Sequence, residues 1–370
     1  MSKLFLLFID LMEFKSILNK WYLKNRRDLP WRNSKDPYSI WVSEIILQQT
    51  RVAQGIGFYN LFMHTFPTVH SLANAHEDEV LKVWQGLGYY SRARNMHKAA
   101  KQIVEKFNGK IPDSFKELLK LSGVGHYSAG AIASFAFKEV VPAIDGNVYR
   151  VMSRIYGLFA SPYTTKGKRE FYELVMELID RKAPHHFNQA LLDFGALQCP
   201  PRNPKCFECP FSQYCYAFRN NLVQSLPIKS KKLIPKNRFF VYLLIRCKGL
   251  TYIHKRNERD IWQSLYQFPL IETEKLLEEQ QIITHPEWKR IFGRSLPKIT
   301  YISPVVKHQL SHQNLNARFV IVEINRITTF IKNSYLAIYT NSIYDYSVPR
   351  LIDNFLAAEP AIKYFLNSPL

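Results

Sequence analysis

Residues 121–131 read Leu-Ser-Gly-Val-Gly-His-Tyr-Ser-Ala-Gly-Ala, and this stretch decides the fold of the first half of the chain. Upstream, Ser114 and Glu117 have the spacing of a capping box, which predicts a helix that stops at glycine. Gly123 and Gly125 then permit a tight turn that exposes backbone N–H groups, and a second, alanine-rich helix follows directly. Such a hairpin can hold a backbone phosphate, although an ordinary helix-turn-helix connection gives the same local pattern.

Outward from this hairpin, most of residues 11–220 shows apolar residues at helical period. A polar, proline-bounded stretch then predicts an interdomain linker, and beyond it the pattern becomes partly strand-like. Because 370 residues exceed what one core usually organises, we expect two domains, a mainly α domain followed by an α+β domain. The predicted helices are 40–49, 79–84, 94–107, 115–121, 168–179, 273–281 and 348–355, and the predicted strands are 239–245 and 319–324.

The chain is strongly basic. Lys and Arg outnumber Asp and Glu by 50 to 30, which gives a net charge of +20 and an isoelectric point near 9.6. This excess predicts a polyanionic partner or an anionic membrane surface. The apolar run 4–9 is followed at once by Asp10 and Glu13, so neither a signal peptide nor a membrane span is expected. We therefore expect a protein of the cytoplasm.

Four of the five cysteines lie in one short segment, while Cys247 stands alone in an apolar run. Six, two and five residues separate the four, and this distribution suits a metal site better than disulfides. Zinc and an iron-sulfur cluster both accept four cysteine ligands, so ligand type alone leaves the metal open. The predicted ligands are Cys199, Cys206, Cys209 and Cys215.

Two carboxyl groups lie in contrasting surroundings. Glu44 lies in a predicted helix that is apolar nearly all round, where desolvation would raise its pKa and keep it protonated, as a general acid requires. Asp145 precedes a segment of helical period and is expected to cap it, where the helix dipole favours the ionised form. The alternatives are a solvated helix edge for Glu44 and a purely capping role for Asp145. Acting together, the two could protonate a leaving group and stabilise a cation.

These motifs occur in an order that resembles one enzyme family. Residues 41–52 read Trp-Val-Ser-Glu-Ile-Ile-Leu-Gln-Gln-Thr-Arg-Val, residues 86–92 read Gly-Leu-Gly-Tyr-Tyr-Ser-Arg, and residues 144–148 read Ile-Asp-Gly-Asn-Val. Together with the hairpin and the cysteine spacing, they resemble the MutY family of adenine DNA glycosylases, within the helix-hairpin-helix endonuclease III superfamily. Ser122 replaces the proline usual in that hairpin, which should loosen the turn without removing its N–H donors.

The resemblance implies a monofunctional DNA glycosylase of base excision repair that removes adenine mispaired with 8-oxoguanine or guanine from double-stranded DNA. It also implies one [4Fe-4S] cluster on the four cysteines. Bifunctional relatives carry a lysine where this chain has Tyr127, so efficient strand cleavage is not expected. The implied catalytic residues are Glu44, Asp145, Tyr127 and Asn147. The implied adenine pocket is Arg27, Leu29, Trp31, Arg32, Val52 and Gln189, and for Leu29 and Trp31 plain core packing is the alternative. The implied DNA contacts are Gln48, Gln49, Thr50, Tyr89, Gly123, Val124 and Gly125.

Residues 239–245 and 262–269 resemble the Nudix-like C-terminal domain of the same family. The run of metal-binding glutamates that a Nudix hydrolase needs is missing from the sequence, so nucleotide hydrolysis is not expected. The loop that recognises 8-oxoguanine corresponds to residues 308–312, where leucine replaces the usual aromatic residue and should weaken stacking. Surface residues of a loop entering a strand are the alternative. The implied recognition residues are His308, Leu310, Ser311 and His312.

Three domain segments follow from these expectations. Residues 1–225 would form the helix-hairpin-helix glycosylase domain with the cluster loop 199–215, residues 226–237 the linker, and residues 238–370 the Nudix-like domain. Residues 1–11 would be an extension without a catalytic role, because Met12 could also begin the chain. Two other functions stay open: an endonuclease III-like glycosylase and lyase for oxidised pyrimidines, and a non-catalytic helix-hairpin-helix DNA-binding protein. We expect a nucleoid-associated monomer with no membrane partner.

Overall fold

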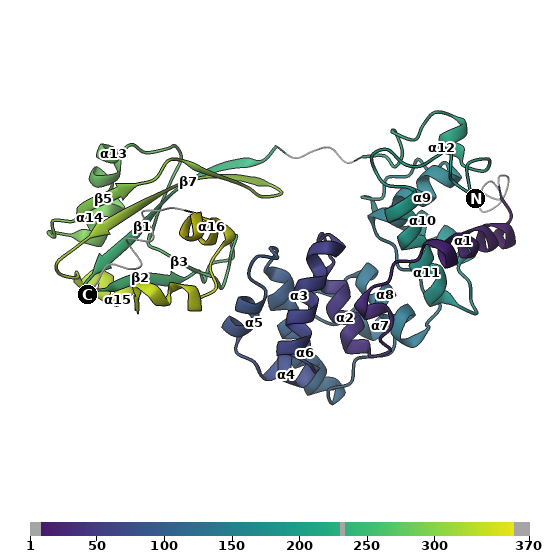
Figure 1. Cartoon of the computed structure of the whole chain (residues 1–370), viewed down its shortest axis with the longest axis horizontal. Helices are drawn as coiled ribbons and strands as arrows, with labels where there is room; N and C mark the ends of the chain where they lie inside the picture. Colours follow the sequence, from purple (N-terminus) through teal and green to yellow (C-terminus); the bar gives the residue numbers. More distant parts are fainter. Residues whose placement is uncertain (1–8, 230–233, 359–370) are drawn as a thin grey trace. The chain divides into compact units, whose positions relative to one another are not determined.

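The computed structural model describes residues 9–229 and 234–358, which form two compact units (Figure 1). Unit 1 comprises Met1–Ala75 and Asn95–Lys231, and unit 2 comprises His76–Arg94 and Lys232–Leu370. The expected N-terminal extension and the expected linker both lie partly outside the described residues.

The described part of unit 1 is built of helices joined by loops, as the sequence predicts. Figure 1 shows them in two groups, one around α2, α3, α6 and α8 and the other around α1, α9, α10 and α11. Their bounds are α1 (Leu11–Asn25), α2 (Pro37–Ile46), α3 (Val52–Thr65), α4 (Val69–Asn74), α6 (Ser91–Phe107, whose first residues belong to unit 2), α7 (Phe115–Leu118), α8 (His126–Phe137), α9 (Gly146–Tyr156), α10 (Thr165–Leu178), α11 (Pro184–Asp193) and α12 (Tyr216–Arg219), with a 3-10 turn, η2 (Pro30–Arg32), and a π-helical turn, η3 (Phe194–Gln198).

Side-chain caps set where several of these helices begin. Asp36 accepts hydrogen bonds from two backbone N–H groups at the start of α2, where Pro37 has no N–H to satisfy. Asp145 caps α9 in the same way, and Ser114 caps α7 by accepting from the N–H of Glu117 at 3.3 Å. The predicted cap positions of Ser114 and Asp145 are therefore confirmed.

Aromatic side chains fill the core around α1, α9 and α10 in unit 1. Phe14, Phe171 and Phe211 are fully buried, and the rings of Phe14 and Phe211 lie 4.9 Å apart. On α8, a Cβ at Gly130 would lie 2.4 Å from the carbonyl oxygen of Pro142, so only glycine lets this helix approach the chain before α9. This close approach brings α8 and the start of α9 together.

Unit 2 contains a sheet of eight strands among its described residues, with helices beside it (Figure 1). The long strands β1 and β7 pair in parallel at its centre, and the other strand pairs are antiparallel. The bounds are α5 (Glu77–Val83), β1 (Lys236–Cys247), β2 (Leu250–Lys255), β3 (Tyr266–Gln267), β4 (Leu270–Thr273), α13 (Glu279–Thr284), α14 (Pro286–Phe292), β5 (Lys298–Ile302), β6 (Val306–Gln309), β7 (Gln313–Glu323), α15 (Thr329–Ser334), β8 (Leu336–Tyr339), η4 (Thr340–Asp345) and α16 (Arg350–Ala358).

The alternation of side chains along β1 explains why this strand is central. Phe240, Tyr242 and Leu244 point into a core shared with α16, whereas Val241 and Leu243 point into a second core shared with α14. Because both faces of β1 are covered along its middle, the sequence from Phe239 to Ile245 contains no charged residue. The prediction of an α+β second half is confirmed, and both predicted strands lie mainly within longer ones, β1 and β7.

One predicted helix was placed wrongly. The sequence favoured a helix over residues 273–281, but Thr273 ends β4, where it pairs with Phe239 of β1, and α13 begins only at Glu279. Glu278 acts as the N-cap, with its backbone N–H bound by the side chain of Gln281 at 3.0 Å. Sheet pairing therefore overrode the local helical pattern.

Candidate active site

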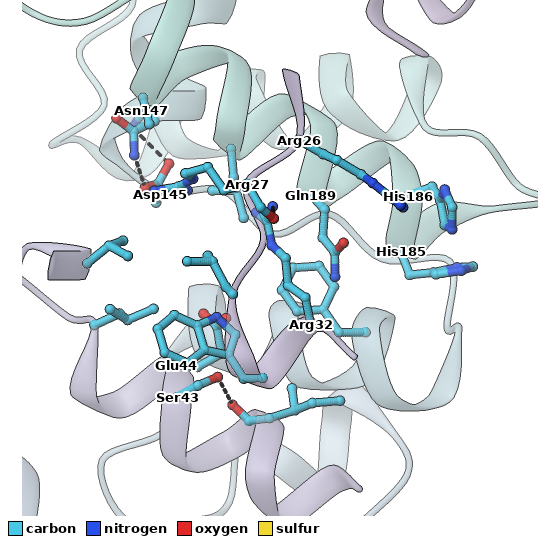
Figure 2. Close-up of a pocket in the computed structure, with 18 of the residues that line it drawn as sticks. Arg26, Arg27, Arg32, Ser43, Glu44, Asp145, Asn147, His185, His186 and Gln189 are labelled. Atoms are coloured by element: carbon cyan, nitrogen blue, oxygen red, sulfur yellow. Dashed lines mark hydrogen bonds between the residues drawn. The ribbon is translucent and has the colours of Figure 1, made fainter. Parts of the chain in front are cut away.

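A cavity of about 1380 Å³ opens among the helices of unit 1 (Figure 2). Its walls come from segments far apart in the sequence: the end of α1, the turn η2, α2, the start of α8, the start of α9 and α11. All four predicted catalytic residues and all six residues of the predicted adenine pocket line this one cavity. Thr50 of the predicted DNA contacts lines it as well.

Glu44 lies on α2 and is 6% exposed. Its Oε2 accepts a hydrogen bond from the hydroxyl of Tyr127 on α8 at 2.7 Å. Burial raises the pKa of Glu44 to about 7, with the negative charge of Asp145 adding to the rise and the Tyr127 hydrogen bond and the charge of Arg32 opposing it. A carboxyl group with this pKa can hold a proton and release it near neutral pH. The solvated-edge alternative for Glu44 is therefore wrong.

Asp145 caps α9 and faces the same cavity (Figure 2). Its Oδ1 accepts from the backbone N–H groups of Asn147 and Val148 at 2.8 and 2.9 Å, and its Oδ2 accepts from the Asn147 side chain at 2.6 Å. Burial raises the pKa of Asp145, while these hydrogen bonds and the charge of Arg150 lower it. Capping was expected to favour the ionised form of Asp145, but the pKa of this carboxyl is raised overall. Asp145 nevertheless accepts three hydrogen bonds that favour its anion, whereas Glu44 accepts one from Tyr127.

Arg150 connects this site to the cysteine segment. Its guanidinium donates to Oδ1 of Asn147 and to the carbonyl oxygen of Gly195, both at 2.7 Å, and its Nε donates to the carbonyl oxygen of Cys199 at 2.7 Å. Arg150 was not among the predicted site residues. Arg150 lies more than one helical turn after Asp145 on α9, and nothing in the sequence distinguishes it from other arginines in predicted helices.

Asp193 is the second residue that the sequence analysis missed. It ends α11, its side chain is fully buried, and it binds both Arg27 and Arg32, which were predicted for the adenine pocket. A signal was present in the sequence, since Asp193 is a lone carboxylate in the apolar run from Ala190 to Phe194. Its partners, however, lie more than 160 positions away in the chain.

The remaining pocket residues divide between packing and polar roles. Leu29 and Trp31 are 5% and 6% exposed, and the Trp31 ring packs edge-on against Tyr59 at 5.1 Å, so each serves the core while it lines the cavity. The side-chain oxygen of Gln189 accepts from the hydroxyl of Tyr22 at 2.9 Å. Val52 lines the cavity at the first turn of α3.

The predicted DNA contacts of unit 1 lie in two turns. Gly123 has a left-handed backbone with φ of 76°, and a Cβ there would lie 2.6 Å from Cβ of Asn95, so the hairpin requires glycine at this point. Val124 is buried, whereas a Cβ at Gly125 would meet no heavy atom within 4 Å, which leaves the N-terminus of α8 open. In the second turn, Gln49 has a left-handed backbone with φ of 56° and Gln48 donates to Ser128 at 2.9 Å.

Tyr89 belongs to unit 2, where it also has a left-handed backbone, with φ of 49°. Its ring is 47% exposed, its face lies 5.6 Å from the Arg92 guanidinium, and its hydroxyl lies 2.6 Å from Oγ of Ser311. Non-glycine residues are uncommon in this region, and strained positions gather at functional sites.

The predicted recognition loop is a β-hairpin between β6 and β7 in unit 2. The backbone N–H of Leu310 donates to the carbonyl oxygen of Gln313 at 2.8 Å, which leaves Ser311 and His312 exposed at the tip. His308 lies within β6 and packs 5.9 Å from the Trp262 ring, and burial lowers its pKa. Of the four residues, Ser311 and His312 are the two that are exposed, and the Ser311 hydroxyl is hydrogen-bonded to that of Tyr89.

The four clustered cysteines are all half-buried thiols without disulfide partners. Burial, and to a smaller extent the charges of the other three cysteines, raise the pKa of Cys209 to about 12, so the four lie within electrostatic reach of one another. Arg154 of α9 donates to Sγ of Cys199 at 3.2 Å, and Cys215 donates to the Arg154 carbonyl oxygen at 3.3 Å. Within residues 9–229 and 234–358, no three His, Cys, Asp or Glu side chains already stand in a metal-binding arrangement. The donor set fits a thiolate-bound centre, but the thiols are not gathered around a common point.

Two family models match separate parts of the chain. Residues 42–179 match the HhH-GPD superfamily of base excision DNA repair proteins, and residues 241–358 match the NUDIX domain. None of the helices described in this chain is long and apolar enough to cross a membrane.

Several curated relatives are adenine DNA glycosylases. The chain is 36% identical over 330 residues to the adenine DNA glycosylase of Buchnera aphidicola subsp. Baizongia pistaciae, an alignment that covers 88% of this chain and 90% of that protein. It is 34% identical to the adenine DNA glycosylase of Buchnera aphidicola subsp. Schizaphis graminum, covering 92% and 96% of the two chains. The human adenine DNA glycosylase is 41% identical over 223 residues, which are 57% of this chain and 41% of the human protein.

Solved structures match the helical part. A thermostable thymine-DNA glycosylase superposes with a TM-score of 0.53 at 28% identity, over 57% of this chain and 97% of that one. An endonuclease III in a non-covalent DNA complex superposes with a TM-score of 0.50 at 22% identity, over 58% and 99%. The second match supports the fold alone, and the predicted helix-hairpin-helix fold is confirmed.

Proposed function

This chain belongs to the adenine DNA glycosylases, a family of helix-hairpin-helix base excision repair enzymes, and from that membership we propose that it removes adenine mispaired with 8-oxoguanine or guanine in duplex DNA. One observation carries the proposal. A buried carboxyl with a pKa near 7, Glu44, and a second carboxyl held by three hydrogen-bond donors, Asp145, line a single cavity large enough for a flipped nucleotide.

The reaction needs a proton on the leaving base and a negative charge near the sugar. Adenine leaves poorly as an anion, so Glu44 donates a proton to the adenine ring as the glycosidic bond breaks and its electron pair moves to the base. Asp145 stays ionised and stabilises the cationic deoxyribose. Water then attacks this cation and gives its proton to the Glu44 carboxylate, which restores the acid. Tyr127 orients Glu44 through the hydrogen bond at 2.7 Å, and Asn147 orients Asp145 through the one at 2.6 Å.

The same site argues against a lyase. A Schiff base requires an amine beside the sugar, and this chain places the hydroxyl of Tyr127 where bifunctional relatives carry lysine. The product is therefore an intact strand with an abasic site, and borohydride should trap no covalent enzyme-DNA adduct. The oxidised-pyrimidine glycosylase and lyase, which was the second candidate, has no observation in its favour here.

We also propose that the duplex contacts come from the two turns of unit 1 and from Tyr89. The open N-terminus of α8 after Gly125 suits a phosphate, because unpaired N–H groups and the helix dipole both attract an anion. Gln48 and Thr50 flank Gln49 at the edge of the cavity, where a side chain could fill the gap left by the flipped base. The net charge of +20 favours the phosphate backbone throughout.

Recognition of 8-oxoguanine is assigned to the β6–β7 hairpin of unit 2. Ser311 and His312 supply exposed hydrogen-bonding groups at its tip. Leu310 packs against the core of unit 2 and His308 packs beside the Trp262 ring, so these two stabilise the hairpin. In this proposal residues 1–225 are the glycosylase domain, 226–237 the linker and 238–370 the Nudix-like recognition domain. The chain would act as a monomer on the nucleoid in the cytoplasm.

The four cysteines are proposed to hold one [4Fe-4S] cluster. Their spacing is that of the cluster loop in the endonuclease III superfamily, and their thiols lie within electrostatic reach of one another. Bound iron would favour the thiolate form, against the effect of burial. The loop between the ligands carries Arg202 and Lys205, so the cluster would fix these cations for phosphate contacts.

One gel assay tests the function. A labelled duplex with adenine opposite 8-oxoguanine is incubated with the protein and then divided, and one half is treated with alkali. Strand breaks only after alkali support a monofunctional adenine glycosylase. Breaks without alkali would support a lyase, and no breaks in either half, with tight binding retained, would support a non-catalytic DNA-binding protein.

A further inference from the structure

Asp193 makes an unusually complete set of contacts for a buried carboxylate. Its Oδ1 accepts from Nε of Arg27 and from an Nη of Arg32, both at 2.8 Å, and its Oδ2 accepts from the other Nη of Arg32 at 2.6 Å. A second nitrogen of the Arg27 guanidinium lies 2.5 Å from Oδ1. The backbone N–H of Arg27 also points to Oδ2, at 3.3 Å. One fully buried anion therefore holds two arginines and the chain between them.

Both arginines lie in the wall of the cavity that contains Glu44 (Figure 2). Their side chains are only 28% and 13% exposed, and Arg32 also donates to the carbonyl oxygen of Arg27 at 2.9 Å. Asp193 ends α11 at the point where the helix widens into the π-helical turn η3, and such turns are frequent at functional sites. Two cations thus line the cavity, and one fully buried anion behind them pairs with both.

The charge of this wall acts on Glu44. The ionisable groups that face Glu44 are Tyr127 from α8, Asp145 at the start of α9 and Arg32 from η2, and the positive charge of Arg32 lowers the pKa of Glu44. Burial raises the pKa of Asp193. The hydrogen bond and charge of Arg32, together with the charge of Arg27, more than offset this effect, so the pKa is lowered overall and the anion is the stable form. Arg32 and Asp193 form a close ion pair, with nitrogen-oxygen distances of 2.6 and 2.8 Å, so the negative charge of Asp193 opposes the positive charge that Arg32 presents to the cavity.

We propose that Asp193 is a positioning residue of this active site, which fixes Arg27 and Arg32 in the wall of the adenine pocket and balances their charge beside Glu44. The inference rests on the proposed function only where adenine release is the readout. A merely structural ion pair would change stability, or would change the rate by the same factor at every pH. If Asp193 instead balances the charge beside Glu44, removing its charge shifts the pH at which the rate falls.

The test compares variants of the full-length protein in which the net charge of Arg27, Arg32 and Asp193 together is changed. The wild-type group of Arg27, Arg32 and Asp193 has a net charge of +1, Asp193→Asn makes it +2, and Arg32→Gln makes it 0. The double variant Arg32→Gln, Asp193→Asn returns it to +1. Each protein is assayed for adenine release in single turnovers across the pH range where Glu44 titrates. In parallel, the Glu44 carboxyl is titrated by carbon NMR in DNA-free protein.

The rate should fall as pH rises through the pKa of Glu44, because the acid must be protonated. We expect the midpoint to move to lower pH by about half a unit or more in Asp193→Asn, as one unbalanced charge predicts. It should move to higher pH in Arg32→Gln and return toward wild type in the double variant. Rescue by the double variant is the decisive result, because removing a second side chain from a damaged scaffold would not restore a pH profile.

Coincident midpoints in all four proteins, or shifts of the same sign in the two single variants, would overturn the proposal. If Asp193→Asn fails to fold, the upward shift in Arg32→Gln and its reversal in the double variant still decide the matter. A wild-type protein that releases no adenine from any mispair would refute the proposed function instead. The NMR titration would then still report whether Asp193 controls the protonation of Glu44.

Discussion

The hydroxyl of Tyr127 donates a hydrogen bond to Oε2 of Glu44 at 2.7 Å, and this contact both orients the acid and lowers its pKa. Burial acts the other way and is the larger effect, which brings the pKa of Glu44 to about 7. Because Tyr127 itself is buried and its own pKa is well above 10, it stays a neutral donor throughout the working range. One contact therefore affects both the orientation and the acidity of Glu44, while burial sets the direction of the overall pKa shift.

Replacing Tyr127 by Phe should raise the pKa of Glu44, since the change removes the one hydrogen bond that favours its anion. Adenine release depends on protonated Glu44, so the fall in rate with rising pH should begin at higher pH than in wild type. Single-turnover rates between about pH 5 and pH 9 measure this shift. A midpoint that moves to lower pH would contradict the assignment of Tyr127.

Replacing Glu44 by Gln should reduce adenine release by at least about 100-fold, because the amide cannot donate the proton. Binding of the duplex should be nearly unchanged, since the substitution is isosteric and buried. The exposed Glu177 of α10 supplies the control, and Glu177→Gln should retain the wild-type rate. If Glu44→Gln kept a tenth or more of the wild-type activity, another acid would have to perform the reaction.

Replacing Asp145 by Asn separates capping from catalysis. Asn caps helices about as well as Asp, so the melting temperature should change little, whereas the loss of negative charge beside the sugar should lower the rate by about 100-fold or more. Asp145→Ala removes the cap as well and should destabilise the fold by about 1 kcal/mol in addition. Thermal melts and single-turnover assays of both variants distinguish the two effects. Equal rates for wild type and Asp145→Asn would leave Asp145 with the structural role alone.

Protein purified without oxygen should show a broad absorption band near 400 nm and should contain about four irons per chain. Cys209→Ala should lose the band, because it removes one of the four thiols. Cys247→Ala is the matched control, since Cys247 is buried in β1 of unit 2 and belongs to a different core. Bound zinc without iron in the wild-type protein would overturn the cluster assignment.

Replacing Ser311 and His312 together by Ala should reduce the preference for adenine opposite 8-oxoguanine over adenine opposite guanine. Both side chains are exposed at the tip of the β6–β7 hairpin, so their removal should leave the core and the melting temperature unchanged. The ratio of single-turnover rates on the two duplexes measures the preference. An unchanged ratio would move lesion recognition to another part of the chain.

The sequence predicted the features that depend on local patterns. Asp145 stood directly before a helical segment and proved to be its cap, and Glu44 stood in an apolar helix and proved to be buried. The contacts of Asp193 could not be read in this way, because helical spacing says nothing about partners more than 160 residues away. The helix expected to start at Thr273 failed for the same reason, since pairing with Phe239 outweighed local preference.

Domain membership shows the same limit. The pattern of residues 76–94 is helical, like that of its neighbours, and the sequence alone placed it with the first domain. In the structure this segment belongs to unit 2, where the Asp78 carboxylate accepts from Lys255 and from Tyr266, and Gln85 donates to Asp353 at 3.0 Å. Such polar contacts depend on which surfaces meet, and hydrophobic periodicity does not record them.

Gln49 and Tyr89 both hold left-handed backbone angles. Residues other than glycine avoid that region unless the surrounding structure enforces it, so the fold itself constrains the backbone of both turns. Little conformational freedom is then lost on encounter, and search along undamaged DNA can proceed without refolding either turn at every step. An enzyme that must inspect very many correct base pairs for each error gains speed when its DNA-contacting turns are preorganised.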